Sequence, residues 1–93
     1  MQVRLSLRAE DDLERIADWV AAHNPRAALE LIQRIRARLE LLTVFPLAAP
    51  EVPGYRPGYR RIVIGRYIVL FAVRRDEVFV ARILHGSTAA AAP

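Results

Sequence analysis

The stretch from Gly58 to Gly86, GYRRIVIGRYIVLFAVRRDEVFVARILHG, decides the fold of this 93-residue chain. It contains three runs rich in β-branched and aromatic residues, separated by two short segments of turn-forming composition. Such a pattern predicts three consecutive antiparallel strands joined by tight turns. Arginines stand among the aliphatic residues, which favours a sheet that also meets a partner.

The two turns fix a register for these strands. Gly65-Arg66 suits a two-residue type II′ turn, because glycine tolerates the positive φ at its first position. A second turn is expected over the four residues Arg74–Glu77. The turns predict these cross-strand pairs: Ile64 with Tyr67, Val63 with Ile68, Ile62 with Val69, Arg60 with Phe71, Val73 with Val78, Phe71 with Val80, and Val69 with Arg82.

This register gives the sheet two faces, because successive side chains of a strand point to opposite sides. One face, with Arg61 near its edge, is expected to pack on helices, and it carries Val63, Ile68, Leu70, Phe79, Ala81 and Ile83. The other is expected to stay open for a partner, and it carries Arg60, Ile62, Tyr67, Val69, Phe71, Val80 and Arg82.

The first half of the chain predicts a short strand and a helical hairpin. Residues 2–5 alternate polar and apolar side chains, and Ser6 is a good N-cap for a helix with acidic residues in its first turn. Asn24-Pro25 ends this helix and starts a second one, which we expect to end at Phe45-Pro46. Trp19 lies off the apolar stripe of the first helix, and we interpret it as an edge residue of the core.

Two segments are predicted to lack regular structure. Residues 46–58 contain four prolines and two glycines, which favours an extended connector between the hairpin and the sheet. Residues 87–93 are small and of low complexity, so we expect a disordered tail after a single domain that spans residues 1–86.

Composition excludes several kinds of function. The chain has no cysteine and two widely separated histidines, which excludes a disulfide framework, a thiol nucleophile and a cysteine-ligated zinc site. No phosphate-binding glycine loop or catalytic triad is recognisable, and we expect no metal and no cofactor. The acidic first twenty residues do not resemble an export signal, and no apolar run is long enough to span a membrane. We therefore expect a cytoplasmic protein without a membrane partner.

Charge is distributed unevenly along the chain. Residues 1–51 contain eight acidic residues and seven arginines, a net charge of −1, whereas residues 52–93 contain two acidic residues and seven arginines, a net charge of +5. A basic half of this kind attracts nucleic acids and acidic protein surfaces.

Five residues are candidates for contact with a target or an antagonist. Arginine binds phosphate and carboxylate in a planar bidentate manner, and an exposed ring can supply an apolar contact beside it. These five residues are Arg60, Arg61, Tyr67, Phe71 and Arg82. No catalytic residue is assigned, and we interpret His85 as a strand-end residue that caps or packs rather than as a general base, because no carboxylate partner is predicted beside it.

The pattern of the chain resembles the ParE/RelE superfamily of small bacterial toxins over about residues 3–86. The residues that carry the resemblance are Ser6, Ala9, Asp12-Leu13, Ile16, Asn24-Pro25, Ala27-Ala28, Leu41-Leu42, Pro46, Gly58-Tyr59-Arg60-Arg61, Tyr67 and His85-Gly86. The resemblance implies an α+β fold of order β-α-α-β-β-β, with an antiparallel sheet packed on an N-terminal helical hairpin. This is also the order that the residues predict by themselves.

The resemblance further implies a toxin of a type II toxin–antitoxin module, which a cognate antitoxin neutralises through its C-terminal segment. We expect that antitoxin to be small, with an acidic C-terminal segment and a DNA-binding N-terminal part. RelE-like members cut messenger RNA on the ribosome with a set of basic residues. In this chain Ile62 and Ile68 stand near positions where that branch is basic, and no arginine or tyrosine follows Ser87. The ParE-like branch, which inhibits DNA gyrase without being a nuclease, is therefore favoured.

Two alternatives stay open on sequence alone. The chain could be a ribosome-dependent messenger RNA endoribonuclease with an altered residue set, or a toxin-derived binding module without toxicity. Whether the toxin forms a homodimer or a hetero-oligomer with its antitoxin is also open.

Overall fold

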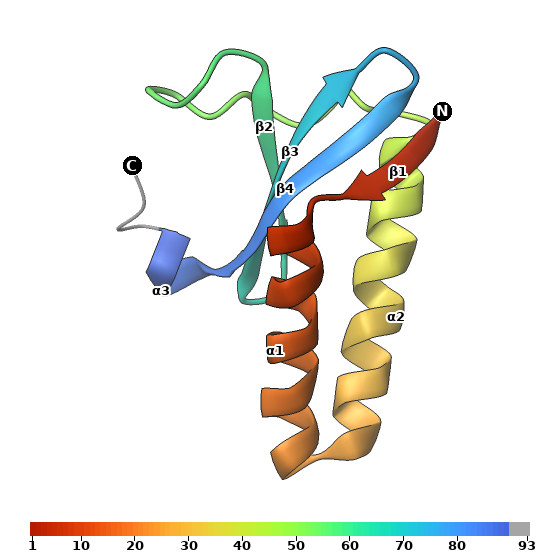
Figure 1. The fold of residues 1–93 in the computed structure, drawn as a ribbon, viewed down its shortest axis with the longest axis vertical. Coiled ribbons are helices and arrows are strands. Elements are labelled where there is room, and N and C mark those ends of the chain that lie inside the picture. Colours follow the sequence, from red (N-terminus) through yellow and green to blue (C-terminus); the bar gives the residue numbers. More distant parts are fainter. Residues whose placement is uncertain (90–93) are drawn as a thin grey trace.

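A computed structural model describes residues 1–89 of the chain (Figure 1). Its elements, in chain order, are β1 (Gln2–Leu5), α1 (Leu7–His23), α2 (Pro25–Leu42), β2 (Tyr59–Ile64), β3 (Tyr67–Arg74), β4 (Glu77–His85) and α3 (Gly86–Ala89). The helices α1 and α2 run side by side, and the four strands form one sheet at the upper end of this hairpin in Figure 1. The predicted α+β class and the β-α-α-β-β-β order are confirmed, with a short helix added after β4.

Both predicted N-caps are present. The Ser6 hydroxyl accepts a hydrogen bond of 3.0 Å from the amide of Ala9, and the Asn24 side chain accepts one of 3.1 Å from the amide of Ala27. Each bond satisfies an amide that has no partner within its own helix. The second helix ends at Leu42, shortly before the predicted end at Phe45-Pro46, because Thr43 already forms its C-cap. Within residues 1–89, no helix is long and apolar enough to cross a membrane.

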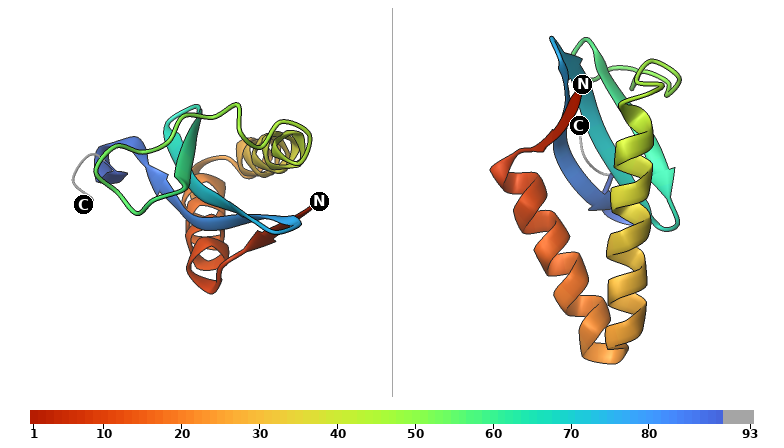
Figure 2. Two further views of the ribbon diagram at one scale, coloured as in Figure 1. Left: turned by 90° about the horizontal axis from the view of Figure 1, so that it is seen from above. Right: turned by 90° about the vertical axis from the view of Figure 1, so that its right-hand side faces the viewer.

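The sheet has the strand order β1-β4-β3-β2. The three C-terminal strands pair antiparallel, as predicted, whereas β1 joins the edge of β4 in parallel. The segment between α2 and β2 crosses from the end of α2 to the far side of β2 (Figure 2, left).

The predicted register is confirmed for the β2–β3 hairpin and for the first part of β4. Gly65 has a φ of +59° at the first turn, and Arg60 lies opposite Phe71. The predicted pair of Val69 with Arg82 is wrong, because Val69 lies opposite Ile83. The register shifts where Leu70 pairs with Arg82 and Phe71 pairs with Val80, which leaves Ala81 as the extra residue of a β-bulge.

Up to the bulge at Ala81, the two faces of the sheet are exchanged relative to the prediction. Beyond it, Ile83 is buried in the core as expected, because the extra residue shifts the alternation of side chains along β4. The helices cover the face that was expected to stay open, and Val69, Phe71 and Val80 are each 0% exposed on it. They pack in one cluster with Ala9 of α1 and with residues of α2. The opposite face, which was expected to be packed, carries Val63 at 56% exposure. Both faces are apolar in sequence, so alternation alone could not show which of them receives the helices.

The start of the predicted disordered tail is ordered in the structure. The amide of Gly86 donates a hydrogen bond of 2.7 Å to the carbonyl of Arg66, and the Ser87 hydroxyl lies 2.8 Å from Nδ1 of His85. These contacts hold residues 86–89 as α3. The rest of the predicted tail lies outside the described residues, so its disorder stays a prediction.

Candidate functional site

The five predicted contact residues do not share one exposed surface. Phe71 is fully buried beneath the helices, so the expectation that its ring lies on an open face is wrong. Arg61 is exposed on the opposite face of the sheet, where Val63 is its exposed neighbour along the strand. The other three residues occupy separate environments, which are described in turn.

Arg60 holds the connector between α2 and β2. Its guanidinium donates a hydrogen bond of 2.6 Å to the carbonyl of Ala49 and a longer one of 3.4 Å to the carbonyl of Leu47. Glu51 lies 3.5 Å away, and the side chain of Arg60 is only 19% exposed. Arg60 therefore satisfies backbone carbonyls of a proline-containing segment that forms no helix or strand.

Arg82 pairs with Asp12 of α1. The guanidinium donates two hydrogen bonds, of 2.8 and 3.0 Å, to the two carboxylate oxygens. The same carboxylate accepts a bond of 2.9 Å from the amide of Ile83. These hydrogen bonds to Asp12 raise the pKa of Arg82 above its ordinary value. Arg82 and Arg60 are thus both engaged inside the molecule and do not share an open face.

Asp12 and Ser6 also form hydrogen bonds with backbone groups at an edge of the sheet. The strand β1 pairs with β4 only as far as Val80, so the backbone of β4 beyond that residue has a free edge. The Ser6 hydroxyl donates a hydrogen bond of 2.7 Å to the carbonyl of Ala81, and Asp12 accepts from the amide of Ile83. Side chains from the start of α1 therefore replace the missing strand.

Tyr67 is the one predicted contact residue that lines a cavity of mixed aromatic and basic character. This hairpin-tip pocket has a volume of about 320 Å³. It lies between α1, the β2–β3 turn and the end of β4, and its lining residues are Arg15, Ile16, Trp19, Arg66, Tyr67 and His85. No sequence pattern indicates this grouping, because the six residues come from three segments that are distant in the chain.

Two glycines allow the chain to form this pocket. Gly65 adopts a positive φ at the hairpin turn. At Gly86, a Cβ atom would lie 3.3 Å from the carbonyl oxygen of Arg66, which accepts the amide of Gly86. The close approach of the two backbones favours a residue without a side chain. Gly86 thereby fixes the end of β4, and with it His85, beside Arg66.

The rings of the pocket are arranged at different angles. Tyr67 and His85 form an edge-to-face pair, with centroids 5.6 Å apart and planes at 90°. Trp19 packs against His23 with a centroid distance of 5.0 Å and is 68% exposed. The interpretation of Trp19 as a core-edge residue is therefore wrong. Its position off the apolar stripe of α1 was the available signal of exposure.

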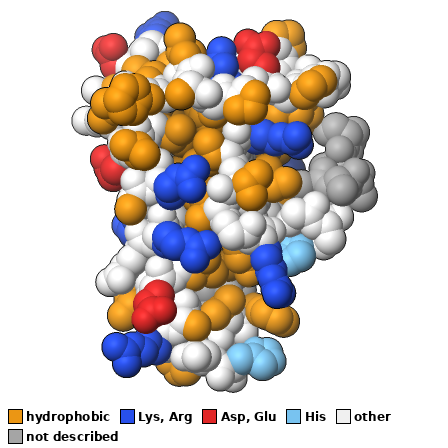
Figure 3. Space-filling view, turned by 180° about the vertical axis from the view of Figure 1, so that it is seen from behind, with side chains coloured by type: hydrophobic (Ala, Val, Ile, Leu, Met, Phe, Trp, Pro, Cys, Tyr) orange, Lys and Arg blue, Asp and Glu red, His pale blue; other side chains and the backbone are white. Residues whose placement is uncertain are grey.

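Arginines surround the hairpin-tip pocket. Arg15 and Arg66 line it, and both are exposed. The guanidinium of Arg34 on α2 lies against the same turn, because a Cβ on Gly65 would be 2.6 Å from one of its nitrogens. Arg15 has a partner in Asp11, at 3.0 Å on the helix surface. Arginine side chains gather in the middle of the face shown in Figure 3, and acidic side chains lie toward its margins.

A longer groove of about 630 Å³ lies where β1 meets the two helices. Its floor is apolar, and Arg4, Arg36, Glu10 and Glu14 stand along its sides; the apolar lining residues are Val3, Leu5, Leu13, Ala17, Ile32 and Leu39. This groove has the composition of a protein-binding surface, with apolar contacts at the centre and charges at the margin.

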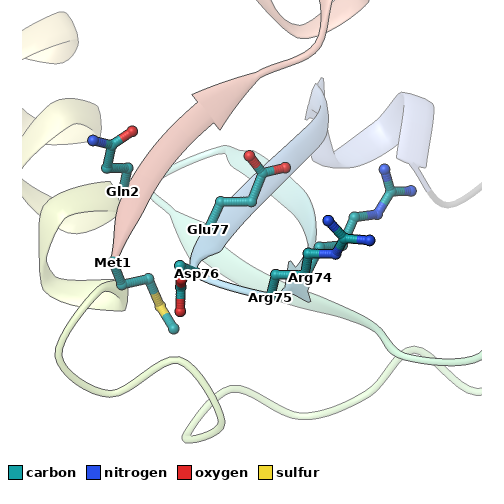
Figure 4. A pocket seen from close by; sticks show the side chains of 6 residues that line it. All are labelled: Met1, Gln2, Arg74, Arg75, Asp76 and Glu77. Atoms are coloured by element: carbon teal, nitrogen blue, oxygen red, sulfur yellow. The ribbon is translucent and has the colours of Figure 1, made fainter.

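A further hollow, of about 770 Å³, lies at the β3–β4 turn and the N-terminus (Figure 4). Its lining is polar, and in Figure 4 the side chains of Arg74 and Arg75 point away from Gln2, with Arg74 donating a hydrogen bond of 3.1 Å to the Tyr59 hydroxyl. Nearby, Arg4 and Arg74 lie over the ring of Phe79, at 4.6 and 4.2 Å from its centroid. Within residues 1–89, no group of three metal-ligating side chains is placed to hold a metal ion.

Comparison with known proteins agrees with this architecture. Residues 3–90 match the family described as the ParE toxin of the type II toxin–antitoxin system parDE. The chain is 33% identical over 88 residues to Toxin RelE1 of Caulobacter vibrioides, an alignment that covers 90% of this chain and 91% of that protein.

Two solved structures have the same fold. The chromosomal ParDE toxin–antitoxin system of P. aeruginosa matches with a TM-score of 0.75 and 27% identity, over 91% of this chain and 95% of the other. The RelB-RelE antitoxin–toxin complex of Methanococcus jannaschii matches with a TM-score of 0.60 over 94% of each chain, and at 21% identity this likeness concerns the fold alone. The chain belongs to the ParE family of toxins of type II toxin–antitoxin systems, within the ParE/RelE superfamily.

Proposed function

We propose that this toxin inhibits DNA gyrase and is not a ribosome-dependent nuclease. One observation supports the proposal most strongly, namely the internal engagement of Arg60 and Arg82. Cleavage of RNA requires cations that are free to stabilise the charge that develops on the reacting phosphate. In this chain Arg82 is paired with Asp12, and Arg60 donates to carbonyls of the connector.

His85 also lacks the surroundings of a general base. Its Nδ1 lies 2.8 Å from the Ser87 hydroxyl, and the amide of Ser87 lies 3.3 Å from the same nitrogen. A catalytic histidine works best when a carboxylate or carbonyl orients it toward the reacting group. The contact with Ser87 instead supports the interpretation of His85 as a strand-end residue.

The matching family model and the P. aeruginosa ParDE structure support the ParE branch. Because one relative is named Toxin RelE1, a RelE-like nuclease is the second candidate function. The two candidates differ in what the purified toxin does to two substrates. One experiment therefore adds the toxin in parallel to gyrase with relaxed plasmid and to ribosomes translating a defined message.

We expect loss of supercoiling in the first reaction and an intact message by primer extension in the second. Codon-spaced cuts in the message, with supercoiling unaffected, would overturn the proposal in favour of the nuclease. Activity in neither reaction, from toxin whose circular dichroism shows it to be folded, would favour a binding module without toxicity.

We further propose that the groove between β1, α1 and α2 receives the antitoxin. The face around Phe71, which was predicted to bind the antitoxin, is buried in the toxin's own core, so the antitoxin must bind another surface. The groove offers an apolar floor, the free edge of β1, and Arg36 for an acidic segment. Changing Arg36 to Glu should weaken binding of the antitoxin in calorimetry, whereas changing exposed Arg75 to Glu, at the β3–β4 turn, should not. Equal affinities of the two variants would place the antitoxin elsewhere.

A further inference from the structure

We propose that the hairpin-tip pocket binds one nucleotide of a single-stranded nucleic acid. In this arrangement a base enters among the rings of Trp19, Tyr67 and His85, and the adjoining phosphates lie against Arg66 and Arg15. This proposal does not depend on whether gyrase is the target. It rests on the lining of the pocket, the charge around it and its access to solvent.

The lining favours a flat ring over an aliphatic side chain. Three of the six lining residues carry rings, and Ile16 is the one aliphatic residue among them. Stacking of a base on an aromatic side chain stabilises single-stranded complexes and tolerates any base, because each base has a π-face. A peptide anchored by leucine or valine would find few aliphatic contacts here.

The charge around the pocket favours an anion. Arg15 and Arg66 are the charged lining residues, and none of the six carries a carboxylate. Arg34 adds a third guanidinium beside the Gly65 turn, on the side that faces α2. Asp11 offsets part of the charge of Arg15. Guanidinium groups beside stacked rings are the combination by which proteins hold the phosphates and bases of single strands.

Access and size favour a single strand over a duplex. Trp19 is 68% exposed, so its ring is available without any rearrangement of the core. The cavity of about 320 Å³ opens between a helix and a hairpin turn, and only an unpaired base can insert its face there. In a duplex the faces of the bases are stacked on each other and inaccessible.

Trp19 provides a direct measurement, because it is the single tryptophan of the chain. The 93-residue toxin is titrated with the DNA decamer dT10 and with its RNA counterpart, while tryptophan fluorescence is recorded. We expect saturable quenching that weakens as salt rises, since phosphate contacts release counterions. The two titrations show whether the strand is DNA or RNA, and either result supports the proposal.

Variants test the site itself through the anisotropy of fluorescein-labelled dT10, or of the RNA decamer if that binds more tightly. Trp19→Leu and Arg66→Gln should each weaken binding about tenfold, which corresponds to the loss of one stacking or one charged contact. Phe45→Leu and Arg75→Gln are matched controls, since they remove an exposed ring and an exposed arginine away from the pocket, and they should leave affinity unchanged. Circular dichroism verifies that each variant is folded.

Three results would overturn the proposal. No quenching or anisotropy change at low salt would show that the pocket does not bind a strand. Equal effects of the pocket and control variants would indicate general attraction to a basic protein. Equal affinity for a ten-base-pair duplex would exclude a site that takes an unpaired base.

Discussion

Asp12 and Arg82, seventy residues apart in the sequence, form a bidentate pair with nitrogen–oxygen distances of 2.8 and 3.0 Å. The pair joins the second turn of α1 to the strand β4, just after the bulge at Ala81. Because Asp12 also accepts the amide of Ile83, one carboxylate fixes both the helix and the free edge of the sheet. An arginine that looked free in the sequence therefore has a structural role.

Replacing Asp12 by Ala should lower the free energy of unfolding by about 2–3 kcal/mol, because it removes charged hydrogen bonds and leaves an amide without its partner. Asp11→Ala is the matched control, since Asp11 pairs with Arg15 on the exposed surface of the same helix. Its cost should stay below about 1 kcal/mol. Urea unfolding measures both, and equal costs would show that the Asp12–Arg82 pair contributes no more than a surface pair.

Replacing Arg60 by Ala should loosen the connector between α2 and β2. The loss of hydrogen bonds to Ala49 and Leu47 should cost about 1–3 kcal/mol. Hydrogen exchange should accelerate at the amide of Val52, which donates to the carbonyl of Tyr59 within the same region. Arg61→Ala, at the exposed neighbouring position, is the control. Unchanged exchange in the Arg60 variant would mean that prolines alone hold the connector.

Replacing Phe71 by Ala should cost about 3–5 kcal/mol, because the ring is fully buried and its removal leaves a cavity. A charged residue at this position should prevent folding altogether, so Phe71→Asp reports on the core and not on the antitoxin. Val63→Ala, on the exposed face of β2, should cost less than about 1 kcal/mol. A Phe71→Ala variant as stable as Val63→Ala would contradict the assignment of the two faces.

The pair of Arg4 with Glu77 predicts a small dependence of stability on pH. The hydrogen bonds from Arg4 lower the pKa of Glu77 from its ordinary value of 4.5. A lowered pKa in the folded state stabilises the protein above the unfolded value, and this contribution is lost as pH falls through the folded value. The Tm difference between the native chain and Glu77→Gln should therefore be full at pH 7 and should fall as the pH drops below the ordinary value of 4.5 and Glu77 becomes protonated in the folded protein. A Tm difference as large at the lowest pH at which both proteins fold as at pH 7 would exclude this cause.

Local signals allowed much of the fold to be predicted. Ser6 and Asn24 are capping residues whose bonds lie within three residues of their own positions, and the structure contains both bonds. The register of the β2–β3 hairpin likewise follows from the Gly65-Arg66 turn, because a two-residue turn fixes which residues of the two strands lie opposite each other. Helix caps and hairpin turns depend on residues that are close in the sequence, so the sequence alone can predict them.

The candidate site depended on contacts between distant segments. The roles of Arg60 and Arg82 are set by Ala49 and Asp12, and no local pattern indicates either partner. Trp19 and Tyr67 meet at one pocket because α1 packs beside the hairpin turn. The bulge at Ala81 also escaped prediction, because a bulge depends on how the strand bends over the core.

By itself, the sequence determined the elements, their caps, the hairpin register and the resemblance to the toxin superfamily. Only the tertiary structure decided which face of the sheet is covered. The strands β2 and β3 carry aliphatic side chains on both sides, so burial of either face would satisfy the hydrophobic pattern. The helices α1 and α2 lie in the connection from β1 to β2. The handedness of this connection places both helices on the face of the sheet that carries Phe71.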